Sequence, residues 1–126
     1  MFEGIAQMDI EESKKAAEES INSLLQICHK AGKLAFGMDV GYRKLNKGKC
    51  KLLILSSDLS VRNSKKLEKE GHDKGVTVIE YGTKAEFGRI FNRTETGILS
   101  IEDRNFARGI KKKLEEIKLL EANWEV

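Results

Sequence analysis

Short apolar runs alternate along this chain with segments in which apolar residues recur at helical spacing, and this alternation constrains the fold most strongly. The runs at 51–56, 76–81 and 97–101 are bounded by glycine or polar residues, as short buried strands are. Strands that alternate with helices predict an α/β fold, namely a three-layer α-β-α sandwich with a small mixed sheet. A length of 126 residues suits one domain.

Glycines and capping residues set the expected helix boundaries, because the chain contains no proline. The first helix is expected to begin at Asp9 or Ser13 and to stop at Gly32. Residues 1–8 show no periodicity and are expected to form a mobile tail, so the single folded domain covers 9–126. The other expected elements are an edge strand at 33–37, helices at 37–48, 60–74 and 83–91, and a last helix capped by Asp103.

The positive charge of the chain is concentrated in one region, although the net charge is only +3. Seven basic side chains and one acidic side chain, Asp39, lie between His29 and Lys51. Such a concentration favours binding of a phosphate backbone, because binding releases counterions. The alternative is a solvated lysine-rich face, and composition alone does not choose between them.

The N-terminus of the expected second helix adds an anion site to this basic region. Its first turn should present free backbone N–H groups and the positive end of the helix dipole near Gly37, Met38, Asp39 and Val40. Arg43, Lys44 and Lys47 follow on neighbouring faces of the same helix. For each of these charges the alternative is exposure to solvent without a ligand.

Signatures of enzymes, cofactor sites and metal sites are mostly missing. The sequence has neither a phosphate-binding P-loop nor a dinucleotide fingerprint, so no cofactor is expected. Asp58 and Asp103 each follow an expected strand, where a catalytic carboxylate is one interpretation and a helix cap is a simpler one for Asp103. Metal-ligand spacing is absent among the residues Cys28, His29, Cys50 and His72.

Membrane and single-strand partners are not expected either. No apolar run approaches the roughly 20 residues of a spanning helix, and the N-terminal segment is too acidic for a signal peptide. The expected location is therefore the cytoplasm. An aromatic content of 6% argues against a stacking platform for single-stranded nucleic acid.

Five segments in a fixed order carry a resemblance to a known family: AGKLAFG, a basic helix ending in Gly48, KLLILSSDLS, VIEYGTKAEFGRIF and GILSIEDRNFARGI. They span about residues 24–113 and resemble the kink-turn-binding ribosomal-protein superfamily typified by the archaeal large-subunit protein seven-Ae, most of all its bacterial YlxQ-type members. The resemblance implies an α-β-α sandwich that binds structured RNA and catalyses no reaction. Ribosomal RNA and a ribonucleoprotein assembly are the implied candidates for partner and setting.

Relatives that bind kink-turns carry Gly-x-Asn-Glu-x-x-Lys at the start of the second helix and an apolar loop before the last strand. Here Gly37 matches the glycine and Arg43 the basic position, whereas Asp39 and Val40 replace Asn and Glu, and the 92–96 loop is polar. These departures fit the YlxQ-type branch and argue against kink-turn specificity. With the charge pattern, the resemblance implies RNA contacts from Lys33, Gly37, Met38, Asp39, Val40, Arg43, Lys44, Lys47, Asn92, Arg93 and Thr94.

An interaction module that binds protein and no RNA is the alternative. The last helix continues beyond the family-like region, and Leu119 lies off its apolar stripe, where it would join a patch for a partner.

Overall fold

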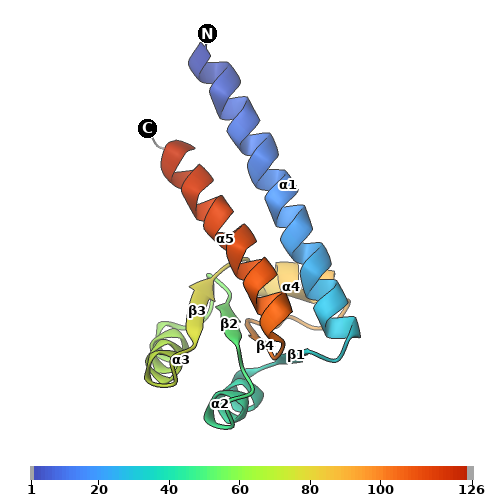
Figure 1. Ribbon diagram of the computed structural model, residues 1–126, viewed down its shortest axis with the longest axis vertical. Coiled ribbons are helices and arrows are strands. Elements are labelled where there is room, and N and C mark those ends of the chain that lie inside the picture. The colour runs from blue at the N-terminus through green and yellow to red at the C-terminus, as the bar shows by residue number, and fades with distance from the viewer. Residues whose placement is uncertain (1, 125–126) are drawn as a thin grey trace.

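The computed structural model describes the backbone of residues 2–124 and the side chains of residues 9–122. The described residues form the elements α1 (Phe2–Lys30), β1 (Leu34–Phe36), α2 (Met38–Asn46), β2 (Leu52–Leu55), α3 (Val61–Asp73), β3 (Thr77–Glu80), α4 (Lys84–Ile90), β4 (Ile98–Ile101) and α5 (Arg104–Trp124). The predicted alternation of helices and strands is confirmed (Figure 1).

The four strands form one mixed sheet in the order β1-β4-β2-β3. β2 and β3 are parallel, whereas β4 runs antiparallel to both β1 and β2. Leu55, the last residue of β2, is in register with Glu80 at the end of β3 and with Ile98 at the start of β4. Three strands therefore end at the edge where β4 begins, which we call the carboxyl edge, and the opposite edge is the amino edge.

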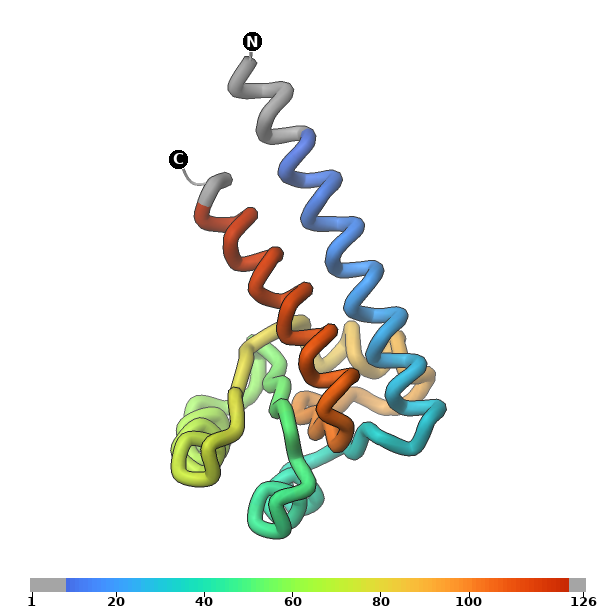
Figure 2. Tube along the Cα trace, in the orientation of Figure 1, coloured from blue at the N-terminus to red at the C-terminus, as the bar shows by residue number. Residues whose placement is uncertain are grey.

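Helices cover both faces of the sheet, which confirms the three-layer sandwich (Figure 1). β2 shows why, because its side chains alternate between two hydrophobic cores. Leu52 and Ile54 pack into the core that contains α1, α4 and α5 residues. Leu53 and Leu55 pack into the core beneath α2 and α3. Figure 2 shows α1 and α5 running side by side away from the sheet toward the two termini.

Two expectations about element boundaries and burial are corrected. The first helix begins at Phe2, so neither Asp9 nor Ser13 is its N-cap, and an ion pair of 3.1 Å from Lys14 to Glu121 ties this extended helix to α5. The side chains of 1–8 lie outside the described residues, and the mobility of this segment stays a prediction. β3 was expected to be buried, yet only Ile79 is, because β3 lies at the edge of the sheet without an outer neighbour.

Polar side chains cap three helices where the sequence predicted helix starts. The Ser60 hydroxyl accepts a hydrogen bond from the backbone N–H of Asn63 at the start of α3. Thr83 does the same for Glu86 in α4, and the Asp103 carboxylate accepts from two N–H groups in the first turn of α5. Such caps satisfy N–H groups that the helix itself leaves unpaired.

Candidate nucleic-acid interface

The carboxyl edge brings the start of α2 together with the loop before β4. The backbone N–H of Gly37 donates to the Ile98 carbonyl at 3.1 Å, and the N–H of Ser56 donates to the Gly97 carbonyl at 2.8 Å. The first bond ties the residue before α2 to the beginning of β4, and the second ties the loop after β2 to the same place. Segments far apart in the sequence thus meet at one edge.

The first turn of α2 is open to a ligand. Gly37 is its N-cap, and no side chain there accepts a hydrogen bond from the helix. A helix leaves its first N–H groups without intrahelical partners, so the turn over Met38, Asp39 and Val40 offers donors and a positive dipole end to an anion. No atom lies within 4 Å of the position that a Gly37 side chain would take, so a ligand backbone can approach closely.

A basic groove continues this site between α2 and α3. It has a volume of about 450 Å³ and is lined by Tyr42 and Arg43 of α2, by Lys47 at the C-cap of this helix and by Lys66 of α3, with Asp39 as its one acid. The Tyr42 hydroxyl donates to a Glu70 carboxylate oxygen at 3.1 Å, a hydrogen bond that raises the pKa of Tyr42. Among the residues described, the three cations of the groove form no ion pair, so their charge faces the groove.

The 92–96 loop is attached to the residue before Gly37. The guanidinium carbon of Arg93 lies 3.9 Å from the centroid of the Phe36 ring, a cation–π contact. Phe36 packs edge to face against Phe91 and His29, with ring centroids 5.0 and 5.1 Å apart. This aromatic cluster places the exposed loop residues Asn92, Arg93 and Thr94 beside the start of α2.

Helix α4 packs against the 92–96 loop through Gly88. A side chain at Gly88 would meet the Arg93 carbonyl oxygen at 3.0 Å and the Glu95 Cα at 3.3 Å. Both are backbone atoms of the loop, so the absence of a side chain at this position permits close packing. The loop geometry therefore depends on α4 as well as on the loop's own sequence.

Two of the predicted contact residues lie elsewhere. Lys33 precedes β1, and the next residue, Leu34, is in register with Ile101 at the end of β4, so Lys33 lies at the amino edge. The Lys44 ammonium lies 2.8 Å from a Glu102 carboxylate oxygen, with the two side chains 22% and 18% exposed. Lys44 therefore points away from the groove, and its charge is already compensated.

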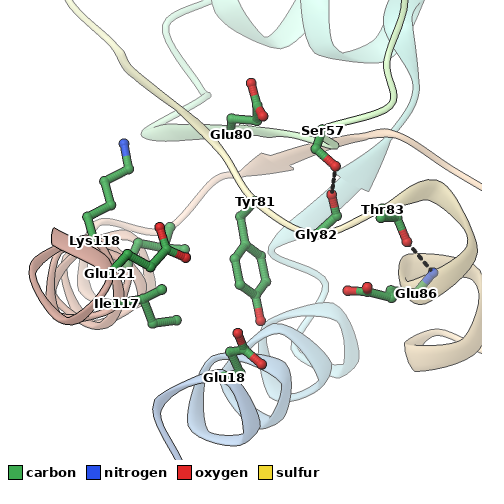
Figure 3. Close-up of a pocket in the computed structure, with 11 residues that line it drawn as sticks. Glu18, Ser57, Glu80, Tyr81, Gly82, Thr83, Glu86, Ile117, Lys118 and Glu121 are labelled. Atoms are coloured by element: carbon green, nitrogen blue, oxygen red, sulfur yellow. Dashed lines mark hydrogen bonds between the residues drawn. The ribbon is translucent and has the colours of Figure 1, made fainter. Parts of the chain in front are cut away.

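An acidic pocket of about 350 Å³ lies on the α1 and α5 side of the sheet. In it the Tyr81 ring points toward α1, with the carboxylates of Glu18, Glu86 and Glu121 around it and the Glu80 side chain directed away (Figure 3). Burial, followed by the charges of Glu18 and Glu86, raises the pKa of Tyr81. Because phosphate is repelled by carboxylates, this pocket is not part of the candidate interface.

The residues considered for catalysis have structural roles. Desolvation acts to raise the pKa of exposed Asp58, but hydrogen bonds, chiefly from the Lys84 N–H at 3.0 Å, and the Lys84 charge lower it on balance, and the Lys84 hydrogen bond fixes the start of α4. Asp103 caps α5. No group of three or more metal-binding side chains suited to an ion occurs in the described part of the chain.

Both cysteines are buried free thiols, and burial raises the pKa of Cys28 and of Cys50 to about 11. They are therefore neutral and unreactive at neutral pH.

We expect the free energy of unfolding to fall as the pH rises from 9.0 to about 11, because thiols ionise near 9.0 in the unfolded chain and only near 11 in the folded one. Urea titrations across this range, under reducing conditions, measure the decline. A Cys28→Ala, Cys50→Ala variant should decline less, and an equal decline would contradict the assignment to the thiols.

Sequence reasoning missed Tyr42, Lys66 and Phe36 as parts of this surface. Lys66 is one of several exposed basic residues of α3, and its sequence context does not distinguish it from Lys65 or Lys69. Phe36 does carry a signal, since it directly precedes Gly37 and is an aromatic residue at the end of an edge strand.

Comparisons with known proteins agree with this architecture. The model of the ribosomal protein L7Ae/L30e/S12e/Gadd45 family matches residues 19–119. The fold is similar to that of a protein with unknown function from Bacillus halodurans C, with 25% identity and a TM-score of 0.73 over 75% of this chain and 96% of that one. It is also similar to the Giardia lamblia 15.5kD RNA binding protein, with 22% identity and a TM-score of 0.68 over 84% and 90% of the two chains. No curated protein matches the chain, and no described helix has the length and apolar character needed to cross a membrane.

Proposed function

The chain belongs to the ribosomal protein L7Ae/L30e/S12e/Gadd45 family, and from this premise we propose that it binds structured RNA at the carboxyl edge without catalysing a reaction. One observation carries the proposal: the uncapped first turn of α2 adjoins a groove whose cations Arg43, Lys47 and Lys66 have no ion-pair partner in the described structure. The printed name of the Giardia lamblia relative, an RNA binding protein, supports the same partner. The proposed location is the cytoplasm, and ribosomal RNA is the first candidate ligand.

In this proposal the RNA backbone runs along the groove between α2 and α3. Arg43 and Lys47 are four residues apart, so they share one face of α2 and reach neighbouring phosphates. The free N–H groups of the first turn bind a further phosphate or a base acceptor. The 92–96 loop then contacts the RNA from the other side of Gly37, through exposed Asn92, Arg93 and Thr94.

We further propose that this chain has the RNA specificity of the YlxQ-type branch and not that of kink-turn binders. Asp39 is exposed and Val40 is partly buried in the first turn of α2. A carboxylate accepts hydrogen bonds from base amino groups but cannot donate one, and valine does neither. We therefore expect a kink-turn to bind no more tightly than an ordinary hairpin.

The test is a double substitution, Arg43→Ala with Lys47→Ala, titrated with an RNA hairpin at several salt concentrations. We expect an affinity loss of roughly tenfold at low salt, and a decrease of about two in the slope of log affinity against log salt, because two phosphate contacts disappear. Far-UV circular dichroism should be unchanged, since both side chains are exposed.

The matched control removes two exposed lysines from the α1–α5 pair, Lys15→Ala with Lys118→Ala, which changes the net charge equally. We expect the control to bind RNA nearly as wild type does. Equal losses in both variants would show diffuse electrostatic attraction and contradict a localised site.

A protein-interaction module is the second candidate, and one observation favours it. Leu119 on α5 is 68% exposed, although Ile110, Leu114 and Ile117 of the same helix are buried in the core. An interaction module without RNA should purify in low salt with no absorbance excess at 260 nm. Nucleic acid that copurifies with the wild type and is lost from the Arg43, Lys47 variant would favour the RNA-binding function instead.

A further inference from the structure

A second basic groove lies at the amino edge, which is the edge of the sheet opposite the proposed RNA site. It has a volume of about 320 Å³ and lies between the starts of β2 and β3 and the first turns of α5. Its four charged lining residues are all cations: Lys51, Arg104, Arg108 and Lys111. None of them forms an ion pair with another residue of the described structure.

Helix geometry places three of these cations in a row. Arg104, Arg108 and Lys111 are spaced four and three residues apart, so they lie on one face of α5. At about 1.5 Å of rise per residue the row extends roughly 10 Å along the helix axis. Lys51 faces it from the sheet, where its ammonium donates to the Gly48 carbonyl at 2.9 Å and keeps two N–H groups for a ligand.

The acidic residues nearest in sequence do not neutralise this row. Glu102 is engaged with Lys44 in the ion pair of 2.8 Å. The Asp103 carboxylate accepts hydrogen bonds from the N–H groups of Asn105 and Phe106 at 2.8 and 2.9 Å. Both carboxylates are thus held by other partners, and the groove keeps its positive charge.

The stability of α5 does not account for the row either. The first turn of a helix favours acidic side chains because of the helix dipole, and cations are unfavourable there. The first turn of α5 has no acidic residue and begins with Arg104. The Asp103 cap offsets part of the cost at Arg104, and Arg108 and Lys111 lie beyond the first turn, where an anion bound to the row would be their counter-charge.

We propose that this amino-edge groove is a second contact for an RNA backbone, so that one chain holds two RNA segments at opposite edges of its sheet. The choice of RNA as the partner rests on the proposed function. Phosphates repeat along a strand at intervals similar to the spacing of the cations in the row, and the planar guanidinium groups of Arg104 and Arg108 can each bind a phosphate through two N–H groups. An acidic protein segment is the competing partner that the experiment must distinguish.

The experiment is a bridging assay with two RNA hairpins as probes. One hairpin is immobilised on beads, the other is fluorescent, and capture of the fluorescent hairpin requires a protein with two RNA sites. Wild type should bridge, and so should the Lys15→Ala, Lys118→Ala control. The Arg108→Ala, Lys111→Ala variant should lose capture to background yet still bind one hairpin at the carboxyl edge, with the salt slope of that site unchanged. Bridging through self-association would survive in this variant and would overturn the proposal.

The two proposals fail separately. If the Arg108, Lys111 variant binds and bridges as wild type does, the proposal of an RNA contact in the amino-edge groove is refuted. The proposal of an RNA site at the carboxyl edge is then unaffected. If the Arg43, Lys47 variant keeps its full affinity while the Arg108, Lys111 variant loses binding, the proposed function at the carboxyl edge fails and the groove remains an RNA contact. Polyglutamate that binds the wild type and not the Arg108, Lys111 variant, with RNA binding equal in both, would overturn RNA as the partner. Circular dichroism of each variant tests for unfolding. We expect none, because the substituted side chains are exposed.

Discussion

Substitution of Phe87 by alanine should lower the free energy of unfolding by about 3 to 5 kcal/mol, as loss of a fully buried aromatic side chain does. Phe87 is completely buried in the core beneath α1 and α5. It anchors α4, a helix of only seven residues that has few other buried side chains. Its ring also fills the space beside Gly82, where an added side chain would approach the ring to 2.9 Å.

Urea unfolding followed by circular dichroism measures this loss, and Leu119→Ala is its control. Leu119 is 68% exposed, so its truncation should change the free energy of unfolding by no more than about 0.5 kcal/mol. A domain with a stability of about 5 kcal/mol would be close to unfolded in the Phe87 variant, whereas one near about 15 kcal/mol would remain folded. A loss below about 1 kcal/mol would mean that α4 contributes little to the core.

The effect of Phe87 extends to the candidate site, because α4 supports the 92–96 loop. Gly88 follows Phe87 and packs against the backbone of Arg93 and Glu95. Displacement of α4 would therefore move the loop relative to Gly37. We infer that the core beneath α1 and α5 stabilises the proposed RNA site on the carboxyl edge without contributing any contact to it.

Sequence reasoning was most successful where the signal was local. The buried strands β2 and β4 were predicted because each is a short apolar run, and both are fully buried. The Asp103 cap and the helix start at residue 83 were predicted because a capping side chain and its N–H partner are two or three residues apart. The three-layer sandwich then followed from the alternation of helices and strands.

The features that sequence reasoning missed depend on contacts between distant residues. The exposure of β3 follows from its place at the edge of the sheet. The residues of a single strand do not predict its position in the strand order. Lys44 was grouped with Arg43 and Lys47 because all three lie on one short helix. Its partner Glu102 lies 58 residues away in the sequence, and only the folded chain shows that this turn of α2 faces the end of β4.

The candidate site also combines residues that sequence proximity predicted correctly with one that it misplaced. Gly37, Arg43 and Lys47 are close in sequence, and the structure brings them together with the 92–96 loop. Lys33 is only four residues before Gly37, but β1 lies between them and separates them to opposite edges of the sheet. Proximity in sequence predicts proximity in a helix and fails across a strand, because a strand rises about 3.3 Å per residue.

Gly37→Ala is expected to lower the free energy of unfolding by about 1 to 3 kcal/mol and to weaken RNA binding as well. Gly37 has φ 99° and ψ 168°, a backbone conformation that is essentially restricted to glycine. No atom lies within 4 Å of the added Cβ position, so the cost is one of backbone conformation and not of collision. Relief of the strain would rotate the first turn of α2 and misdirect its free N–H groups.

Gly48→Ala is the matched control, because Gly48 follows the other end of α2, also has a positive φ, 71°, and also has no atom within 4 Å of its Cβ position. A left-handed conformation costs alanine about 1 to 2 kcal/mol, so both variants lose comparable stability. Hairpin affinity measured well below both melting temperatures should fall much more in Gly37→Ala, since Gly48 follows Lys47 at the other end of α2 and its substitution leaves the free N–H groups of the first turn in place. A similar decrease in both variants would show that binding follows the general stability of α2, and the N-terminus of α2 would then lose its assignment as the point of RNA contact.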